Sequence, residues 1–107
     1  MRDPKAFAVY IMTNTFRGVL YVGMTSDLPG RVWKHREGAL EGFTRRYGLK
    51  RLVWCEPHAS AEGAITREKQ IKRWRRTWKF ELIEARNSEW IDLWPEITGQ
   101  LVGPRLV

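Results

Sequence analysis

Residues 7–23 read FAVYIMTNTFRGVLYVG, and this stretch decides the fold of the chain. Two apolar, β-prone runs, residues 7–12 and 19–23, flank a segment of turn-forming residues that ends at Gly18. Two such runs joined by a short polar segment are typical of a β-hairpin. The stretch therefore predicts two antiparallel strands.

The hairpin brings two tyrosines together. A loop of four residues, Asn14 to Arg17, pairs Met12 with Val19 and therefore pairs Tyr10 with Tyr21. Side chains that lie directly opposite each other in an antiparallel pair share one face of the sheet. We therefore expect the two tyrosine hydroxyls to lie side by side.

The rest of the chain predicts one more strand and several helices. In chain order we expect a helix from about residue 28 to 39 capped by Asp27, a basic loop over 42–50, a strand over 51–56 ended by Pro57, a helix from Ser60 to about 76, a helix over 77–86, and an amphipathic turn over 88–94 closed by Pro95. The order ββαβαα predicts an α+β domain with a small sheet. We place this domain at residues 1–98 and a tail at 99–107.

Composition limits the class of protein. A chain of 107 residues is long enough for one domain. Its net charge of +7 favours a polyanionic partner, most often nucleic acid, over a merely soluble basic protein. The single Cys55 excludes an internal disulfide and indicates a reducing compartment. Since no membrane-spanning stretch or signal-peptide pattern occurs, we expect a cytoplasmic protein without membrane contact.

Two polar side chains interrupt the apolar stripe of the first predicted helix. Arg31 and His35 lie one turn apart and next to Leu28 and Val32 on the inward face. One interpretation is structural, with Arg31 paired to a core carboxylate and His35 hydrogen-bonded in the core. The other is an anion site, because the planar guanidinium presents donors that fit a phosphate. From this helix alone the two interpretations have equal weight.

A carboxylate interrupts the helix after Ser60 in the same way. Glu68 lies in the middle of an inward stripe that consists of Ala61, Ala64, Ile65, Ile71 and Trp74. An ion pair with Lys72 would be a surface interaction of little stability, so it does not explain an inward carboxylate. Mg²⁺ often binds through one or two protein carboxylates, which makes Glu68 the candidate metal ligand.

The predicted nucleic-acid surface is basic and contains aromatic residues. Tryptophans and Phe80 lie among the basic residues near this helix, which favours contact with phosphates supported by stacking. The candidates are Arg45, Arg46 and Lys50 in the basic loop, and Arg67, Lys72, Arg73 and Arg76 on or near the helix. Asn87 has two open roles, as the cap of the last short segment or as a residue at the edge of the site.

These residues together resemble the GIY-YIG nuclease family. The two motif elements are similar to Val9-Tyr10-Ile11 and Tyr21-Val22-Gly23, with Val9 in place of the motif glycine. Met24 stands where some repair nucleases of the family carry lysine. The resemblance covers roughly residues 6 to 94 and is greatest to small single-domain members.

The family's functional residues match positions in this chain. Its helical arginine and the histidine one turn later match Arg31 and His35, and its metal-binding glutamate matches Glu68. Its late asparagine is similar to Asn87. Each match is a polar residue, and the matches occur in the family's order.

The resemblance implies a three-stranded antiparallel sheet flanked by helices and a divalent-metal-dependent endonuclease acting on DNA. It implies that Glu68 binds Mg²⁺ or Mn²⁺ and that Arg31 stabilises the transition state. Tyr10 or Tyr21 would then orient or deprotonate the attacking water, and His35 would be a base, a proton relay or a phosphate donor. A rival hypothesis is a non-catalytic nucleic-acid-binding module on the same fold. A third is an adaptor that binds a protein partner through its tryptophans.

Overall fold

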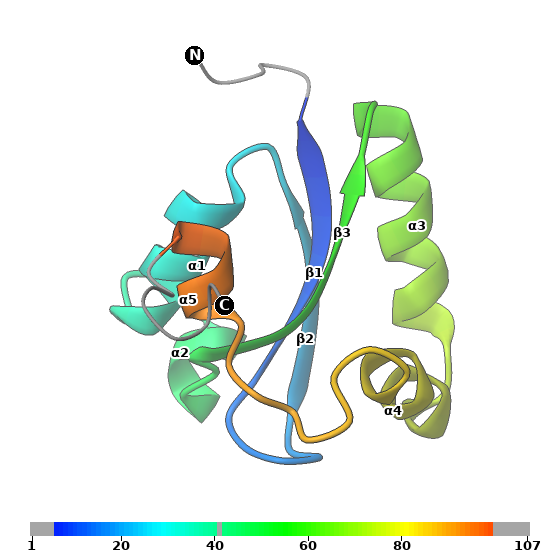
Figure 1. Ribbon diagram of the computed structural model, residues 1–107. Coiled ribbons are helices and arrows are strands. Elements are labelled where there is room, and N and C mark those ends of the chain that lie inside the picture. Colours follow the sequence, from blue (N-terminus) through cyan, green and yellow to red (C-terminus); the bar gives the residue numbers. More distant parts are fainter. Residues whose placement is uncertain (1–5, 41, 100–107) are drawn as a thin grey trace, which may run out of the picture.

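The protein consists of one small sheet between two groups of helices. The computed structural model describes residues 6–40 and 42–99. Its elements are β1 (Phe7–Thr13), β2 (Leu20–Thr25), α1 (Leu28–Arg36), α2 (Phe43–Tyr47), β3 (Arg51–His58), α3 (Ala61–Arg73), α4 (Arg76–Glu84) and α5 (Trp94–Thr98). The strands are antiparallel in the order β2-β1-β3, with α1, α2 and α5 on one side and α3 and α4 on the other (Figure 1). The predicted α+β fold with a three-stranded antiparallel sheet is confirmed.

The hairpin has a register different from the predicted one. Tyr10 lies opposite Gly23, and Tyr21 lies opposite Met12, so the predicted pairing of the two tyrosines is wrong by two residues. The loop is longer than predicted, because β2 begins at Leu20. A shift of two residues keeps each side chain on its own face of the sheet. The tyrosines therefore still share a face, with ring centroids 6.2 Å apart.

Alternation along the strands builds a core on each face of the sheet. The core under α3 and α4 contains Val9, Ile11, Val22, Val53, Trp54, Ala64, Ile71, Ile83 and Trp90. The core on the α1 side contains Tyr10, Met12, Val32, Leu49 and Leu52. Because β1 is the central strand, Tyr10 is fully buried, and its polar hydroxyl lies inside the second core.

A short helix, α2, replaces the predicted basic loop over residues 42–50. Thr44 and Leu49 are buried and anchor this segment to the domain. Gly48 ends the helix in the left-handed conformation at φ 64°, which favours glycine. A helix of five residues gives no clear apolar periodicity, so its sequence does not predict it.

Two prolines lie inside regular elements, although Pro57 was expected to end its strand and Pro95 to close the turn over residues 88–94. Pro57 belongs to β3, an edge strand. The carbonyl of Cys55, two residues earlier, faces away from β1 and accepts from Arg86. Because backbone groups alternate along a strand, the nitrogen of Pro57 also faces away from β1, where no N–H is needed to pair with β1. Pro95 lies in the first turn of α5, where a missing N–H costs little.

The described part of the chain ends just after α5. Gly99 follows that helix in a left-handed conformation, and residues 100–107 of the predicted tail lie outside the described residues. None of the helices in the described ranges is both long enough and apolar enough to cross a membrane.

The segment after α4 covers the outer edge of β3. Four hydrogen bonds join the two: from the Leu52 N–H to Asp92, from the Leu93 N–H to the Leu52 carbonyl, from Asn87 to the Val53 carbonyl and from Arg86 to the Cys55 carbonyl. Buried and edge backbone groups need such partners. The backbone of β3 is therefore paired with β1 on one side and with this segment on the other.

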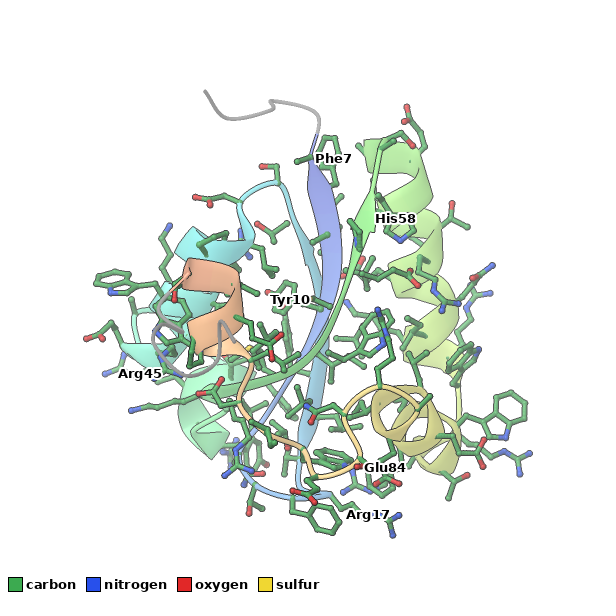
Figure 2. The ribbon with its side chains drawn as sticks, in the orientation of Figure 1. Phe7, Tyr10, Arg17, Arg45, His58 and Glu84 are labelled. Atoms are coloured by element: carbon green, nitrogen blue, oxygen red, sulfur yellow. The ribbon has the colours of Figure 1, made fainter. Side chains whose placement is uncertain are left out.

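One carboxylate holds the tip of the hairpin against α4. Glu84 accepts two hydrogen bonds from Arg17, at 2.8 and 2.9 Å, and a third from the buried indole of Trp90 at 2.7 Å. The bonds from Arg17 and then from Trp90 lower the pKa of Glu84 to about 2. Figure 2 shows Arg17 and Glu84 together at one end of the molecule. Glu84 thus joins the hairpin, α4 and the following segment.

Candidate active site

Tyr10 extends from the central strand over a glycine of β2. A Cβ atom at Gly23 would lie 2.6 Å from the Tyr10 hydroxyl oxygen and 2.8 Å from Cε2 of Tyr21, which is closer than side chains approach. Only glycine leaves this space free. Gly23 therefore allows the Tyr10 ring to lie against β2, next to the ring of Tyr21.

His35 of α1 completes an aromatic cluster with these tyrosines. Its Nε2 is hydrogen-bonded to the Tyr10 hydroxyl at 2.9 Å, and its ring centroid lies 5.6 Å from that of Tyr10 and 5.4 Å from that of Tyr21. Burial and, next, the charge of Arg31 lower the pKa of His35 to about 4. His35 is therefore neutral at pH 7.

The cluster contains a buried polar atom without a partner. Nδ1 of His35 makes no hydrogen bond among the described residues. A neutral imidazole has one donor and one acceptor nitrogen, so either a donor or an acceptor is left unpaired. Unpaired buried polar atoms are rare in folded proteins and often mark functional positions.

The Tyr10 hydroxyl keeps its proton in the folded protein. Burial raises the pKa of Tyr10 well above its ordinary value, and the neighbouring Tyr21 raises it further. Arg31 acts in the opposite direction, but burial dominates the pKa of Tyr10. Tyr21 is only half-buried and lies on the edge strand β2, so it is the more accessible of the two tyrosines.

Arg31 lies in the first half of α1, next to this cluster. Asp27 begins the helix by accepting a hydrogen bond from the Gly30 N–H at 3.2 Å, and Pro29 lies in the first turn. Arg31 is half-buried as a residue, and its charge lowers the pKa values of both Tyr10 and His35. Among the residues that the structure describes, no carboxylate forms an ion pair with Arg31.

Glu68 lies at the margin of the buried face of α3. Its charge raises the pKa of Tyr10, which places it near the cluster. Its carboxylate pairs with Lys72 at 3.1 Å, and its side chain is 20% exposed against 50% for Lys72. Ile65 was expected to face inward but is 40% exposed, because Ala64 and Ile71 form the centre of the buried face.

The site offers one carboxylate to a metal ion. Across residues 6–40 and 42–99 no group of three or more His, Cys, Asp and Glu side chains could hold a metal. Mg²⁺ keeps several waters and commonly uses one or two carboxylates together with substrate phosphates. The partly exposed Glu68 fits a hard cation of this kind, whereas a zinc site would need three or four protein ligands.

Several exposed cations among the predicted nucleic-acid-binding residues form no ion pair with any described residue, among them Arg45, Arg46, Lys50 and Arg73. Arg45 and Arg46 belong to α2, and Figure 2 shows Arg45 on the side of the sheet away from α3. The guanidinium of Arg46 lies 5.7 Å from the ring centroid of the exposed Tyr47. These side chains are available to a polyanion.

The other predicted cations are engaged within the protein. Arg67 donates to both carboxylate oxygens of Glu56, at 3.0 and 3.4 Å. Lys72 pairs with Glu68. Arg76 donates to two carbonyls of the hairpin loop, at 2.9 and 2.6 Å. Their structural contacts compete with binding to phosphate.

Asn87 lies beside β3, at the sheet edge opposite β2. Its side chain is buried, donates to the carbonyls of Val53 and Ile91, and accepts from the Ile91 N–H. The amide is therefore occupied by the protein itself. Of its two open roles, the geometry supports the local structural one.

Sequence reasoning missed a second polar cluster, on the other flank of α3. Glu56 accepts from His58 at 2.8 Å and from Arg67. Partial burial alone would raise the pKa of Glu56, but the hydrogen bonds from His58 and Arg67 hold it below its usual value. Residues 56 and 58 share a face of β3, so the cluster could have been found only by continuing that strand past Pro57.

The three-stranded sheet and the polar cluster on it define a small α+β domain built around a hairpin motif. The sequence model described as the GIY-YIG catalytic domain matches residues 6–81, and the chain belongs to this family. The resemblance found from the motifs is thereby confirmed.

Relatives of the chain are small, stand-alone members of the family. The UPF0213 proteins SAV0488 and SA0446 of Staphylococcus aureus strains Mu50 and N315 are each 35% identical to it over 69 residues, which covers 64% of this chain and 84% of each relative. The solution NMR structure of the UPF0213 protein BH0048 from Bacillus halodurans matches with a TM-score of 0.52 and 29% identity, covering 84% of this chain and 95% of that one.

Proposed function

We propose that the protein is a divalent-metal-dependent endonuclease that hydrolyses phosphodiester bonds in DNA. GIY-YIG domains are generally endonucleases, which supports the reaction class. The observation that carries the proposal is the meeting of the neutral Tyr10–His35 pair, Arg31 and Glu68. A half-buried arginine without an ion-pair partner in the described structure suits a phosphate that arrives with a cation.

Glu68 is the residue that would hold Mg²⁺ or Mn²⁺, completed by water and phosphate oxygens. A divalent ion there would supply positive charge to offset the charge that develops on the phosphate. Lys72, now paired with Glu68 at 3.1 Å, has an exposed side chain that can move away when the carboxylate gains a stronger partner.

Arg31 orients the scissile phosphate and stabilises its transition state. Its donors form a planar fork, which can contact two phosphate oxygens at once. Partial burial strengthens this interaction, since the local dielectric constant is lower than that of water.

The two tyrosines have different tasks. Tyr10 is buried, hydrogen-bonded to His35 and raised in pKa, so it positions the cluster instead of accepting a proton. Tyr21 is the more accessible tyrosine and orients the attacking water. His35 is neutral and can accept a proton through its imidazole.

A cleavage assay with one matched pair of variants tests this proposal. Purified protein is incubated with plasmid and branched DNA in Mg²⁺, Mn²⁺ or EDTA. We expect cleavage with the metals only, and we expect Glu68→Gln to abolish it without loss of DNA affinity. The control is Glu62→Gln, which neutralises an exposed carboxylate in the first turn of the same helix and should cleave normally.

Three further variants divide the roles. Arg31→Ala should slow cleavage by about 100-fold, the usual cost of losing one well-placed donor, and Arg31→Lys should restore it only in part. Tyr21→Phe should lose more activity than Tyr10→Phe, and both variants should remain folded. Cleavage by Glu68→Gln at the wild-type rate would contradict the metal role, and binding without any cleavage would favour the non-catalytic binding module.

A further inference from the structure

Two tryptophans form an exposed corner where α3 meets α4. The rings of Trp74 and Trp78 lie 6.2 Å apart between centroids and are nearly perpendicular, at 78°. Trp78 is 47% exposed. Single exposed apolar residues are common on protein surfaces, so exposure alone does not mark a site. The corner is distinguished by the meeting of two tryptophan rings.

Surface hollows adjoin Trp74 on two sides and differ in chemistry. One, of about 330 Å³, is lined by Trp74, Trp78, Glu81 and Leu82. The other, of about 450 Å³, is lined by Thr66, Lys69, Gln70, Arg73 and Trp74. The first is aromatic with one carboxylate, and the second is cationic and polar. A ligand that fills both has a flat apolar part joined to an anionic part.

The surroundings of the corner are strongly cationic. Guanidinium groups lie over both rings, Arg67 at 5.4 Å from the Trp74 centroid and Arg75 at 5.0 Å from that of Trp78. Arg73 is exposed and makes no ion pair with any described residue. Charge complementarity therefore selects an anionic partner.

We infer that this corner binds an unpaired nucleotide of single-stranded DNA, with the base against Trp78 and the adjoining phosphate beside Lys69 and Arg73. Perpendicular rings let a base stack on one tryptophan while its edge touches the other. Glu81 repels phosphate and accepts hydrogen bonds from base amino groups, which fixes this orientation.

The stacking corner is separate from the candidate active site, although both use α3. Trp74 packs beneath Arg67, which donates to Glu56 on β3, whereas Glu68 pairs with Lys72 and its charge raises the pKa of Tyr10. The inference rests on the proposed function only in that both concern nucleic acid. A DNA strand bound at the corner would be held on one flank of α3 while another part reaches Glu68 on the other flank.

The chain provides a matched control in Trp33 of α1. Trp33 is 51% exposed, close to the value for Trp78. Among the described residues, no arginine lies over its ring and no second aromatic ring packs on it. If exposed tryptophan alone were enough for binding, Trp33 and Trp78 would contribute equally.

The test is equilibrium binding in EDTA, so that it does not depend on cleavage. Fluorescence anisotropy measures the affinity of the whole protein for a labelled 12-nucleotide oligodeoxycytidylate and for a 12-base-pair duplex, which are choices of about the size of one site. Trp78→Ala should weaken binding of the single strand by about 5- to 50-fold, as expected for loss of one stacked base. Trp78→Phe should recover most of the affinity, and Trp33→Ala should bind as the wild type does.

The phosphate part of the site has its own readout. Arg73→Gln should reduce the slope of log affinity against log salt by about 0.7, the value for one phosphate contact on a single strand. Trp78→Ala should leave that slope unchanged, because stacking releases no counterions. Duplex affinity should change little in Trp78→Ala.

Two results would overturn the inference. One is wild-type affinity of Trp78→Ala for the single strand, which would exclude the corner from DNA binding. The other is an equal loss for duplex and single strand. Thermal unfolding of each variant shows that it is folded, and loss of single-strand binding together with intact duplex cleavage separates this inference from the proposed function.

Discussion

The ring of Tyr10 occupies the space that a side chain at position 23 would fill. A Cβ atom at Gly23 would lie 2.7 Å from Cζ of Tyr10, which is closer than such atoms approach. Their positions opposite each other in the hairpin make this contact unavoidable. The motif glycine therefore sets the position of the tyrosine ring as well as the strand geometry.

Gly23→Ala should impair activity more than folding. The added methyl group would push the Tyr10 hydroxyl away from His35 and from Tyr21. We expect cleavage to fall by at least 10-fold, because small displacements of catalytic groups are costly. Gly63→Ala adds the same group in α3, where the nearest atom is the Ser60 hydroxyl at 3.2 Å, and should cleave normally. Equal activity of the two variants would contradict this role of Gly23.

His35 should make the protein less stable in mild acid. Burial holds its pKa at about 4 in the folded protein, against 6.5 for an ordinary histidine. Between these values the unfolded chain binds a proton that the folded chain does not, so stability is complete above pH 6.5 and falls as the pH approaches 4. Glu56 and Glu84 have pKa values below the usual 4.5, so their contributions are lost at lower pH.

Urea unfolding at pH 7 and pH 5 measures this effect. The wild type should lose more stability between the two pH values than His35→Phe, in which the titrating group is replaced by a ring of similar size. A pH dependence that persists unchanged in His35→Phe would assign it to another group.

At the scale of elements, sequence patterns predict which face of a strand or helix is buried more reliably than which residues lie opposite each other. The alternation in β1 and β2 places both tyrosines on one face, but the turn residues do not determine the loop length, and the pairing shifts by two residues. The stripe of α3 identifies Ala64 and Ile71, but Ile65 faces water since the sheet covers less of the helix than the pattern suggests. A five-residue helix such as α2 gives too few turns to be found.

Variants of Glu84, whose carboxylate binds both Arg17 and Trp90, test how the hairpin is attached to α4. Glu84→Ala removes the acceptor of the buried Trp90 indole as well as the partner of Arg17. Arg17→Ala removes only an exposed cation and leaves the Trp90 bond in place. Glu84→Ala should therefore lower the melting temperature more than Arg17→Ala. Equal shifts would mean that the indole bond contributes nothing.

At the scale of the whole molecule, charge should control association with DNA. The net charge of +7 predicts affinity that falls steeply with salt. Replacing Arg45 and Arg46 by glutamine should reduce the salt slope for duplex DNA by about 0.9 for each arginine that contacts a phosphate. Arg17→Gln removes a cation already paired with Glu84 and should leave the slope unchanged. Identical slopes would place the duplex elsewhere on the surface.

The sequence predicted the fold class and the members of the polar cluster better than the interactions between them. Inward polar positions on separate elements identified Arg31, His35 and Glu68 before any contact was known. The Tyr10–His35 bond could not be predicted, because it depends on how α1 packs on the sheet. The engagement of Arg67 and Arg76 likewise depends on distant partners in β3 and the hairpin loop.

The cover on the outer edge of β3 has a consequence for aggregation. An open strand edge is a template on which further chains can add. Here the residues from Arg86 to Leu93 occupy that edge, and Pro57 offers no N–H to an incoming strand. The match to the family ends at residue 81, before this cover begins. A fragment cut at that boundary would keep the motifs but expose β3, and it would tend to associate edge to edge into insoluble material.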